Sequence, residues 1–296
     1  MKDWSTLIEK LSETTGEKLS AFKVGPPVGG GCINQAVTVE AGGTRYFVKH
    51  NQPSRSEMFA AEADGLKALA ATRTVRVPTP ICWGIGRDMT FIVLEYLDLS
   101  SGSSNAQTPT VLGRQLAAMH RTSQALFGWH RANTIGSTPQ INDCAENWTE
   151  FFRDRRLGFQ LELAGKNGNG ALLARGEKLL SCLGHFFEGY APRPSLLHGD
   201  LWAGNAGETR LGEPVLFDPA VYFGDREADL AMTELFGGFS ETFYRSYNEV
   251  WPLHSGYTTR KTLYNLYHVL NHLNLFGRSY LAQAERMIGE LLALVR

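Results

Sequence analysis

The sequence has few of the features that would place a protein in a membrane or an oxidising compartment. Its 296 residues include only four cysteines, at positions 32, 82, 144 and 182, and no two of them have metal-ligand spacing. No run of about 18 apolar residues occurs, so no membrane span is expected. The N-terminus also lacks the apolar core of a signal peptide. We therefore expect a cytoplasmic protein with free thiols.

An excess of charge of either sign is also missing. The formal net charge is -1, which gives no electrostatic reason to expect a nucleic acid or another polyanion as partner. Hydrophobic residues make up 43% and charged residues 20% of the chain, as in an ordinary globular protein. A chain of this length can form two domains or two lobes.

The first hundred residues have a pattern of strands around a glycine-rich loop. Apolar residues from Trp4 to Leu11 recur at helical spacing, and residues 28–36 contain the glycine loop. Strands are expected at 37–40 and 45–49, joined at Gly42-Gly43, because tight hairpin turns need positive φ. A helix over 56–71 and strands over 77–85 and 90–96 complete this part.

The remainder of the chain is mainly helical in pattern. The polar segment 99–105 predicts a flexible connection, so the lobe boundary is placed before it, giving an N-lobe of residues 1–97 and a C-lobe of 98–296. Short strands are expected near 196–197 and 215–217. Helices are predicted over residues 110–120, 147–163, 171–190, 226–236 and 260–295. A strand-rich lobe before a larger helical one predicts an α+β fold of the protein-kinase-like, two-lobe type.

Residues 198–205, with the sequence HGDLWAGN, carry the strongest chemical signal. Phosphoryl transfer needs a carboxylate near the attacking hydroxyl and oxygen ligands that hold magnesium across the phosphates. Asp200 fits the first role, and Asn205, five residues later, fits the second. Asp218 follows an apolar strand and fits the role of the second magnesium ligand. Each could instead cap loop backbone, but their order along the chain with Lys49 and the glycine loop favours catalysis.

Neighbouring polar residues have simpler interpretations. His198 is predicted to support the catalytic loop by hydrogen bonding instead of transferring protons. Asp225, Glu227 and Asp229 form an acidic run that helix capping and the helix N-terminal field explain, so they are not assigned as metal ligands.

The nucleotide-binding residues are predicted from the first part of the chain. Lys49 ends a strand, where kinases keep the lysine that contacts the α- and β-phosphates, although a solvated charge there is common. Such a lysine needs a carboxylate partner. Glu62 in the next helix is the first choice and Glu57 is the second.

Two backbone segments are expected to complete the nucleotide site. Gly29, Gly30 and Gly31 have neither the P-loop lysine nor G-x-G-x-x-G spacing, and they are predicted to lie over the phosphates. The adenine is expected to pair with the backbone of the connector 95–97, at Glu95 and Leu97.

Several segments along most of the chain together resemble the fructosamine kinase (ketosamine kinase) family, which is related to aminoglycoside phosphotransferases and choline kinases. They are residues 29–34, 127–129, 133–136 with Pro139 and Gln140, 198–205, and 218–227. Trp202 and the run after Asp218 are the more specific of these. The resemblance implies ATP- and Mg²⁺-dependent phosphorylation of ketosamines, such as fructosamines or ribulosamines, at O3 of the sugar. The 3-phosphate is unstable and releases the amine, which implies a role in deglycation.

The resemblance also implies residue roles. Asp200 would be the catalytic base, Asn205 and Asp218 the magnesium ligands, and Lys49 the phosphate ligand, with Trp202 near the sugar. Core packing remains the alternative for Trp202. Trp129 and Gln140 could anchor the loop that contains Asn133. Cys32 in the glycine loop could be a redox-sensitive thiol that pairs within the protein or between subunits, or an inert one.

Three other functions are compatible with the pattern to different degrees. A related kinase could act on an aminoglycoside or choline-like alcohol, with specificity in residues 148–163 and their arginines 153, 155 and 156. A non-catalytic pseudokinase would be expected to lack one of Lys49, Asp200, Asn205 and Asp218, and a protein kinase to carry D-F-G and A-P-E. The expected partner is a small-molecule or protein-bound ketosamine, without nucleic acid or membrane, for a monomer or homodimer.

Overall fold

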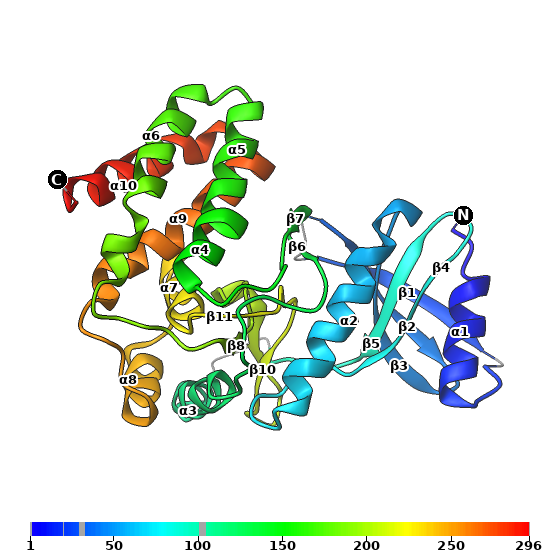
Figure 1. Ribbon diagram of the computed structural model, residues 1–296. Helices are drawn as coiled ribbons and strands as arrows, with labels where there is room; N and C mark the ends of the chain where they lie inside the picture. The colour runs from blue at the N-terminus through cyan, green and yellow to red at the C-terminus, as the bar shows by residue number, and fades with distance from the viewer. Residues whose placement is uncertain (1, 20, 30–32, 101–104, 296) are drawn as a thin grey trace. The chain divides into compact units, whose positions relative to one another are not determined.

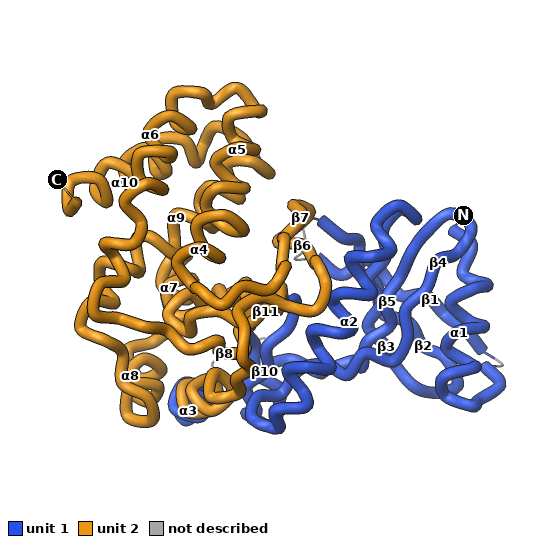
Figure 2. Tube along the Cα trace, viewed as in Figure 1, with its two compact units in different colours: residues 1–112, 204–219 blue, residues 113–203, 220–296 orange. Residues whose placement is uncertain are grey.

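The computed structural model describes residues 2–19, 21–29, 33–100 and 105–295. They form two compact units, residues 1–112 with 204–219 and residues 113–203 with 220–296, coloured blue and orange in Figure 2. Each unit is therefore built from two separate stretches of the chain. The predicted boundary between nucleotide-binding and catalytic lobes at residue 97 stays a prediction.

The first unit is built on an antiparallel sheet of five strands in the order β1-β2-β3-β5-β4 (Figure 1). Its elements are α1 (Ser5–Thr15), β1 (Phe22–Val28), β2 (Gln35–Ala41), β3 (Thr44–Asn51), η1 (Pro53–Arg55), α2 (Ser56–Ala71), β4 (Pro80–Ile85), β5 (Thr90–Glu95), β9 (Ala206–Glu208) and β10 (Pro214–Leu216). The turn between β2 and β3 is made by Gly42 and Gly43, with φ of 58° and 82°, as the sequence predicted.

The two faces of this sheet are covered by different helices. Leu7 and Leu11 of α1 share a core cluster with Val39 and Val48. Since side chains alternate along a strand, Lys49 points to the face opposite Val48. Glu62 of α2 meets Lys49 there, so α2 lies on that second face.

The second unit is mainly helical. Its helices are α4 (Trp148–Phe152), α5 (Phe159–Lys166), α6 (Gly170–Ser181), α7 (Glu227–Leu235), α8 (Glu241–Val250), α9 (Tyr257–Phe276) and α10 (Leu281–Ala293), with a π-helical segment η2 (Arg153–Gly158) and 3-10 turns η3 (Leu183–Phe187) and η5 (Arg278–Tyr280). Its short strand pairs are β6 (Asn133–Ile135) with β7 (Thr138–Gln140), and β8 (Ser195–Leu197) with β11 (Tyr222–Gly224). Two elements span the unit boundaries: α3 (Thr108–His120) and η4 (Ala203–Asn205).

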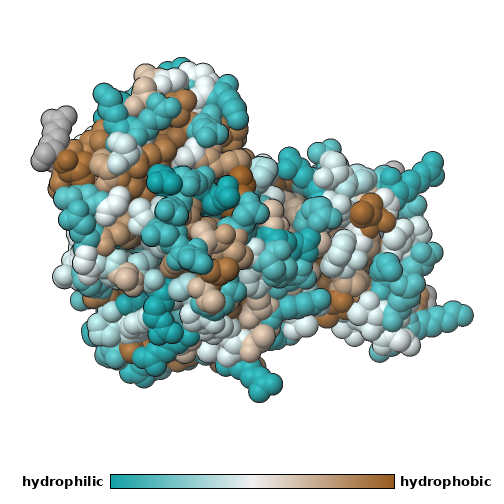
Figure 3. Space-filling view, in the orientation of Figure 1, coloured by the Kyte–Doolittle hydropathy of each residue, from teal (hydrophilic) through white to brown (hydrophobic). Residues whose placement is uncertain are grey.

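The core of this unit is contributed by aromatic and leucine side chains of α4, α5, α9 and α10. On the face in Figure 3, apolar colour gathers over α6 and α10. Within the described residues, none of the helices combines the length and the apolar composition that crossing a bilayer requires.

Two predicted helices are shorter than expected. The region 260–295 is interrupted because α9 ends at Gly277, whose φ of 88° is incompatible with a continuing helix. The region 171–190 stops as a helix at Ser181 and continues as a 3-10 turn. The helix α8 and the strands β6, β7, β9 and β11 were not predicted.

The connection predicted at 99–105 is attached to the first unit at both described ends. The N–H of Ser100 donates to the Glu208 carbonyl at 2.7 Å, and the N–H of Asn105 donates to the Glu208 carboxylate at 3.0 and 3.1 Å. These bonds to β9 explain why the compact first unit extends past residue 97.

Candidate active site

Lys49 lies between two carboxylates in the first unit. Its ammonium nitrogen is 2.5 Å from Glu62 Oε1 and 2.5 Å from Asp218 Oδ1. Lys49 is 6% and Glu62 is 9% exposed, so this ion pair is largely removed from water. The structure thus selects Glu62, the first choice from the sequence, as the partner of Lys49 over Glu57.

The local folds explain this meeting. Tyr46 and Val48 of β3 face the core beneath α1, which directs the intervening and following residues to the α2 side. On α2, Phe59 and Leu66 are buried against the sheet, and Glu62 lies between them at helical spacing. Glu62 therefore lies on the apolar face of α2, where it contacts Lys49.

The charges of this cluster hold the lysine in its protonated form. Burial alone would lower the pKa of Lys49, but the negative charges of Asp218 and Glu62 outweigh it and raise that pKa above its usual value. Burial raises the pKa of Glu62, while the Lys49 charge opposes this shift. The result is a fixed cation with one partly exposed carboxylate beside it, since the Asp218 side chain is 44% exposed.

Asn205 and Asp218 lie at the same end of a two-stranded sheet. Strand β9 begins after Asn205, and β10 ends two residues before Asp218, with Ala206 paired to Leu216. The N–H of Phe217 donates to the Asn205 carbonyl at 3.1 Å. The antiparallel hairpin thereby brings together two residues that are thirteen positions apart in the sequence.

The backbone at Asp218 is unusual. Its φ is 59°, one of two positive values among the described non-glycine residues. Asp tolerates this left-handed region better than most residues, and such conformations concentrate at functional sites. The turn presents the Asp218 carboxylate to Lys49 instead of continuing the strand.

Asp200 lies in the second unit, in a loop that is held by its backbone. The N–H groups of His198 and Gly199 donate to the two oxygens of Asp229, at 2.7 and 2.8 Å. The Asp200 N–H donates to Nδ1 of His198 at 3.3 Å. His198 is fully buried, and these bonds agree with its predicted supporting role.

Asp229 is the site residue that the sequence interpretation underestimated. It is 1% exposed and also accepts a hydrogen bond from His120 Nε2 at 3.1 Å. Burial would raise the pKa of Asp229, but the hydrogen bonds from His120 and from the backbone lower it, so the carboxylate stays ionised. Helix capping does not describe Asp225 and Glu227 either. The Asp225 carboxylate accepts the N–H of Glu227 and the hydroxyl groups of Tyr190 and Tyr264, and Glu227 is paired with Arg260 at 2.7 Å.

Gly199 and Ala220 are in close backbone contact. Gly199 has a φ of 82°, and a Cβ at this position would be 2.1 Å from the Ala220 carbonyl oxygen. The Ala220 N–H donates to the His198 carbonyl at 2.8 Å. Only glycine allows the loop that carries Asp200 to lie this close to the segment that follows Asp218.

A buried amide network fixes the same segment from the other side. Gln140 donates to Asn133 Oδ1 at 2.8 Å and to the Ala220 carbonyl at 3.1 Å. Asn133 donates to the Val221 carbonyl at 2.8 Å. Gln140 also accepts a hydrogen bond from the Tyr267 hydroxyl at 2.7 Å. The predicted anchoring of the Asn133 loop by Gln140 is present, and it reaches further than expected.

The three arginines proposed for specificity have different environments. Arg156, in the π-helical segment, is fully buried and lies 4.0 Å from the ring centroid of Tyr222. Arg153 pairs with its neighbour Asp154 at 2.7 Å, and Arg155 lies 3.8 Å from Asp143. Arg156 is therefore part of the packing beneath the 222–224 strand.

Trp202 is 36% exposed, and its ring lies edge-on to Phe236 at 6.3 Å. This exposure argues against the core-packing alternative for Trp202. Its position in the loop, two residues after Asp200, follows directly from the sequence.

The described residues give fewer contacts for the predicted glycine loop and the predicted adenine site. Gly29 is exposed, whereas Gly30, Gly31 and Cys32 lie outside the described residues. Glu95 closes β5, and its carboxylate is bonded to the Arg76 guanidinium. Adenine pairing by the backbone of Glu95 and Leu97 remains a prediction.

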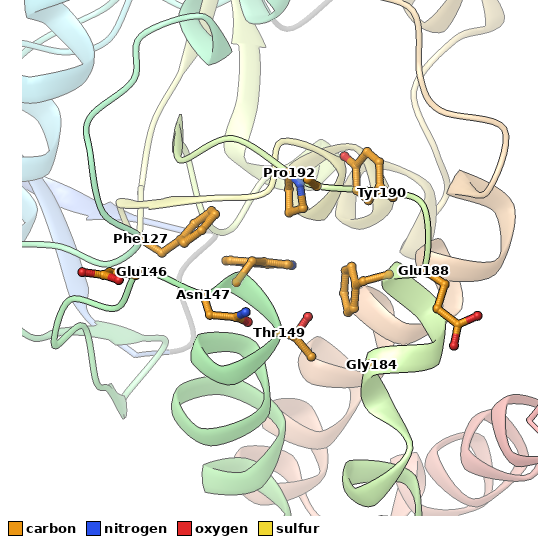
Figure 4. A pocket seen from close by; sticks show the side chains of 11 residues that line it. Phe127, Glu146, Asn147, Thr149, Gly184, Glu188, Tyr190 and Pro192 are labelled. Carbon is orange, nitrogen blue, oxygen red and sulfur yellow. The ribbon is translucent and has the colours of Figure 1, made fainter.

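A separate pocket of about 450 Å³ lies in the second unit. In Figure 4, Phe127, Tyr190 and Pro192 border it, with Glu146 and Glu188 on opposite sides. Its lining includes Trp148 and Thr149 of the segment considered for specificity, but none of the predicted catalytic, nucleotide-binding or metal-binding residues.

The donor set is compatible with magnesium. No group of three or more His, Cys, Asp or Glu side chains among the described residues could hold a metal ion by itself. Mg²⁺ does not require one, because it is bound by one or two carboxylates together with phosphates and water. Asp218, bonded to Lys49 through one oxygen and partly exposed, fits such a role, and the Asn205 amide is a suitable second donor type.

The fold and these residues define a phosphotransferase of the protein-kinase-like class. Solved structures with this fold include aminoglycoside phosphotransferases bound to ADP, at TM-scores of 0.55 and 0.61. Their identity to this chain is 14% and 15%, so they show the fold alone. The predicted fold class, an antiparallel-sheet lobe and a helical lobe, is confirmed.

The chain belongs to the fructosamine kinase family, whose model matches residues 3–294. It is 45% identical over 295 residues to a protein from Synechocystis assigned as a ketoamine kinase, covering 98% of this chain and 97% of that protein. It is 42% identical to the chloroplastic protein-ribulosamine 3-kinase of Arabidopsis thaliana, covering 96% and 86%. A crystal structure assigned as a fructosamine-3-kinase from Haemophilus somnus has a TM-score of 0.86 at 29% identity, covering 98% and 97%. The predicted family is thereby confirmed, and the protein is a phosphotransferase.

Proposed function

We propose that this enzyme transfers the γ-phosphoryl group of ATP to O3 of the sugar moiety of a ketosamine, such as a ribulosamine or fructosamine. The family membership and the names of its relatives support this substrate class. The observation that carries the assignment of the site is the buried Lys49 held by Glu62 and Asp218, because a kinase needs a fixed cation beside a metal-binding carboxylate.

Lys49 acts on the phosphates of ATP. Glu62 holds the Lys49 ammonium in place through its carboxylate, so that the ammonium binds the α- and β-phosphates without first losing side-chain freedom. Asp218 and Asn205 hold magnesium, which supplies charge neutralisation at the phosphates when it is bound. Gly29, Gly30 and Gly31 cover the phosphates, and the backbone of Glu95 and Leu97 pairs with adenine.

Asp200 acts on the acceptor. Its carboxylate accepts the proton of the O3 hydroxyl as that oxygen forms the bond to the γ-phosphorus and ADP leaves. The loop that carries Asp200 is fixed by the bonds from His198 and Gly199 to Asp229, which keeps the carboxylate oriented without ordering costs during the reaction. The exposed face of Trp202 contacts the apolar C–H side of the sugar.

The test is ATP consumption with ribulosamines, fructosamines and aminoglycosides, using wild type and the Asp200→Asn and Asp200→Ala variants. We expect turnover on a ketosamine and a loss of at least about a thousandfold in kcat for both variants, with ATP binding retained. Turnover only on aminoglycosides, or on none of the compounds, would reject the substrate assignment. Loss of ATP binding together with activity would reject the role of Asp200.

The alternatives make different predictions in the same assay. An aminoglycoside-type kinase would consume ATP with an aminoglycoside but not with a ketosamine, and a choline-type kinase would do so only when a choline-like alcohol is added as acceptor. A pseudokinase would bind ATP and turn over none of the acceptors. No specific contact in the structure favours either, and both lack the support that the family match gives to ketosamines.

A further inference from the structure

The second unit has a row of aromatic side chains that begins at Trp202, in the loop of Asp200, and extends to α9 and the residues that follow it. Trp202 lies 6.3 Å from Phe236, which follows α7, and Phe236 lies 4.8 Å from His272 on α9. His272 then lies 5.1 Å from Tyr280 and 5.4 Å from Phe276, all measured between ring centroids. We call these five residues the aromatic row.

The aromatic row is not an ordinary part of the core. Phe276 is 48% and Trp202 is 36% exposed, while Phe236, His272 and Tyr280 are half-buried. Tyr280 packs partly against the core cluster, which fixes the far end of the row. A contiguous set of partly exposed aromatic rings on a folded protein indicates a binding surface, because such surface is costly to leave in water.

The length of the row exceeds what a sugar needs. One pentose or hexose covers about one aromatic ring, and Trp202 alone offers that. The three further steps from ring to ring together match at most roughly five residues of extended polypeptide. The sugar and its reacting hydroxyl thus bind at the Trp202 end of the row. The other four rings are available to bind the group that carries the sugar.

We propose that the aromatic row binds the carrier of the ketosamine, and that this carrier is a polypeptide with apolar or aromatic residues beside the glycated amine. The inference rests on the proposed ketosamine kinase function and identifies the substrate class at the same site. Continuity with Trp202, two residues from Asp200, places the row on the path of the carrier.

The chemistry of the row fits such a carrier. The secondary amine of a ketosamine is protonated at neutral pH, and aromatic faces attract organic cations. Burial lowers the pKa of His272, so its imidazole is neutral and does not repel that amine. The flanking side chains of a peptide then stack on Phe276 and Tyr280 at the exposed end.

The experiment compares three substrates that carry the same ketosamine. In one, the ketosamine is on the ε-amine of Nα-acetyl-lysine amide; in the others, it is on a central lysine flanked by glycines or by phenylalanine and leucine. We expect wild type to prefer the aromatic-flanked peptide over the glycine-flanked one by about tenfold in kcat/KM. Phe276→Ala and Tyr280→Ala should reduce this ratio toward one, mainly through KM.

Leu211→Ala is the matched control, since Leu211 is 95% exposed and lies in the other unit. It should keep the wild-type ratio. Equal kcat/KM of wild type on the two peptides, or an unchanged ratio in both aromatic variants, would overturn the inference. Thermal melting of each variant separates a loss of folding from a loss of recognition.

Two further outcomes are distinguishable. If no ketosamine is phosphorylated at all, the proposed function fails and the inference fails with it. If Phe276→Ala instead converts a dimer to a monomer in sedimentation and leaves the peptide ratio intact, the row is a contact between copies of this chain, and the carrier assignment is wrong.

Discussion

Replacing Glu62 by glutamine tests the central ion pair of the first unit. The glutamine keeps the size and one acceptor oxygen of the glutamate but removes its charge from the 2.5 Å contact with Lys49. Removing one partner of a buried pair typically costs about 3–5 kcal/mol, because it leaves a buried charge uncompensated. Here Asp218 still binds Lys49, so we expect a loss of about 2 kcal/mol in unfolding free energy.

Catalysis should suffer by a similar amount. Without the Glu62 charge, the Lys49 ammonium pairs with Asp218 alone and moves away from the position in which it binds the phosphates. A cost of about 2 kcal/mol corresponds to a reduction of roughly thirtyfold in kcat/KM for ATP. We expect most of it in the KM for ATP, with the KM for the ketosamine changed by less than about twofold. Steady-state kinetics with each substrate varied, together with urea denaturation, gives both numbers.

Glu57→Gln supplies the matched control, because Glu57 is exposed and lies in the first turn of the same helix. Its loss should cost no more than about 1 kcal/mol, the usual effect of an acidic residue near a helix N-terminus. If Glu62→Gln and Glu57→Gln have the same kinetics, Glu62 does not position Lys49, and the reasoning about the buried pair is refuted.

Three other predictions concern the second unit. Burial lowers the pKa of His268 to about 3. As pH falls below 6.5, the unfolded chain therefore takes up this proton first, and the folded protein loses about 2 kcal/mol of stability between pH 6.5 and 5. Denaturation at each pH should show that this loss disappears in His268→Gln but persists in the variant of an exposed histidine, His185→Gln. An unchanged pH slope in His268→Gln would show that His268 titrates normally. Gly199→Ala should lower both the melting temperature and kcat, since its Cβ would clash with the Ala220 carbonyl at a positive φ, and a variant with wild-type stability would contradict the described loop. Gln140→Leu should lower the free energy of unfolding by about 3 kcal/mol, because it removes two donated hydrogen bonds and leaves the Tyr267 hydroxyl without its acceptor. Calorimetry measures this variant, with Gln140→Glu as the size-matched comparison. Wild-type stability of the leucine variant would contradict the described network.

The sequence predicted the first unit in more detail than the second. Strand alternation and the Gly42-Gly43 turn locate β2 and β3, and helical spacing locates α2 at its observed bounds, 56–71. These are local patterns, in which each residue's environment repeats along the chain. Lys49 and Glu62 followed from their places in those elements, together with the order of the motifs.

The hydrogen bonds that hold the Asp200 loop could not be predicted in the same way. The bonds from His198 and Gly199 to Asp229, and from Gln140 to Ala220, join residues 30 or more positions apart. No periodicity marks an amide or a carboxylate that turns inward to meet a distant carbonyl or N–H. Asp229 was therefore assigned to helix capping, the commonest local role for an acidic residue near a helix start.

The interruption of the last helical region has a comparable cause. Gly277 is a single glycine in an otherwise helical pattern, and a glycine in a helix costs only about 1 kcal/mol. With a φ of 88° it ends α9, and α10 then packs back onto α9 and brings Ala284 and Ile288 into the core. That tertiary contact is absent from the local sequence.

The return of residues 204–219 to the first unit has a consequence for synthesis and for recombination. A ribosome completes residues 1–112 before it makes the β9–β10 hairpin of the same unit. The nascent N-terminal part therefore lacks its last strands until the 91 residues of 113–203 have been added. A gene hybrid between two family members cannot exchange one unit by a single crossover, because the junctions fall after residues 112, 203 and 219. Relatives of this chain should therefore tolerate three-junction hybrids at these positions better than hybrids joined once near residue 100.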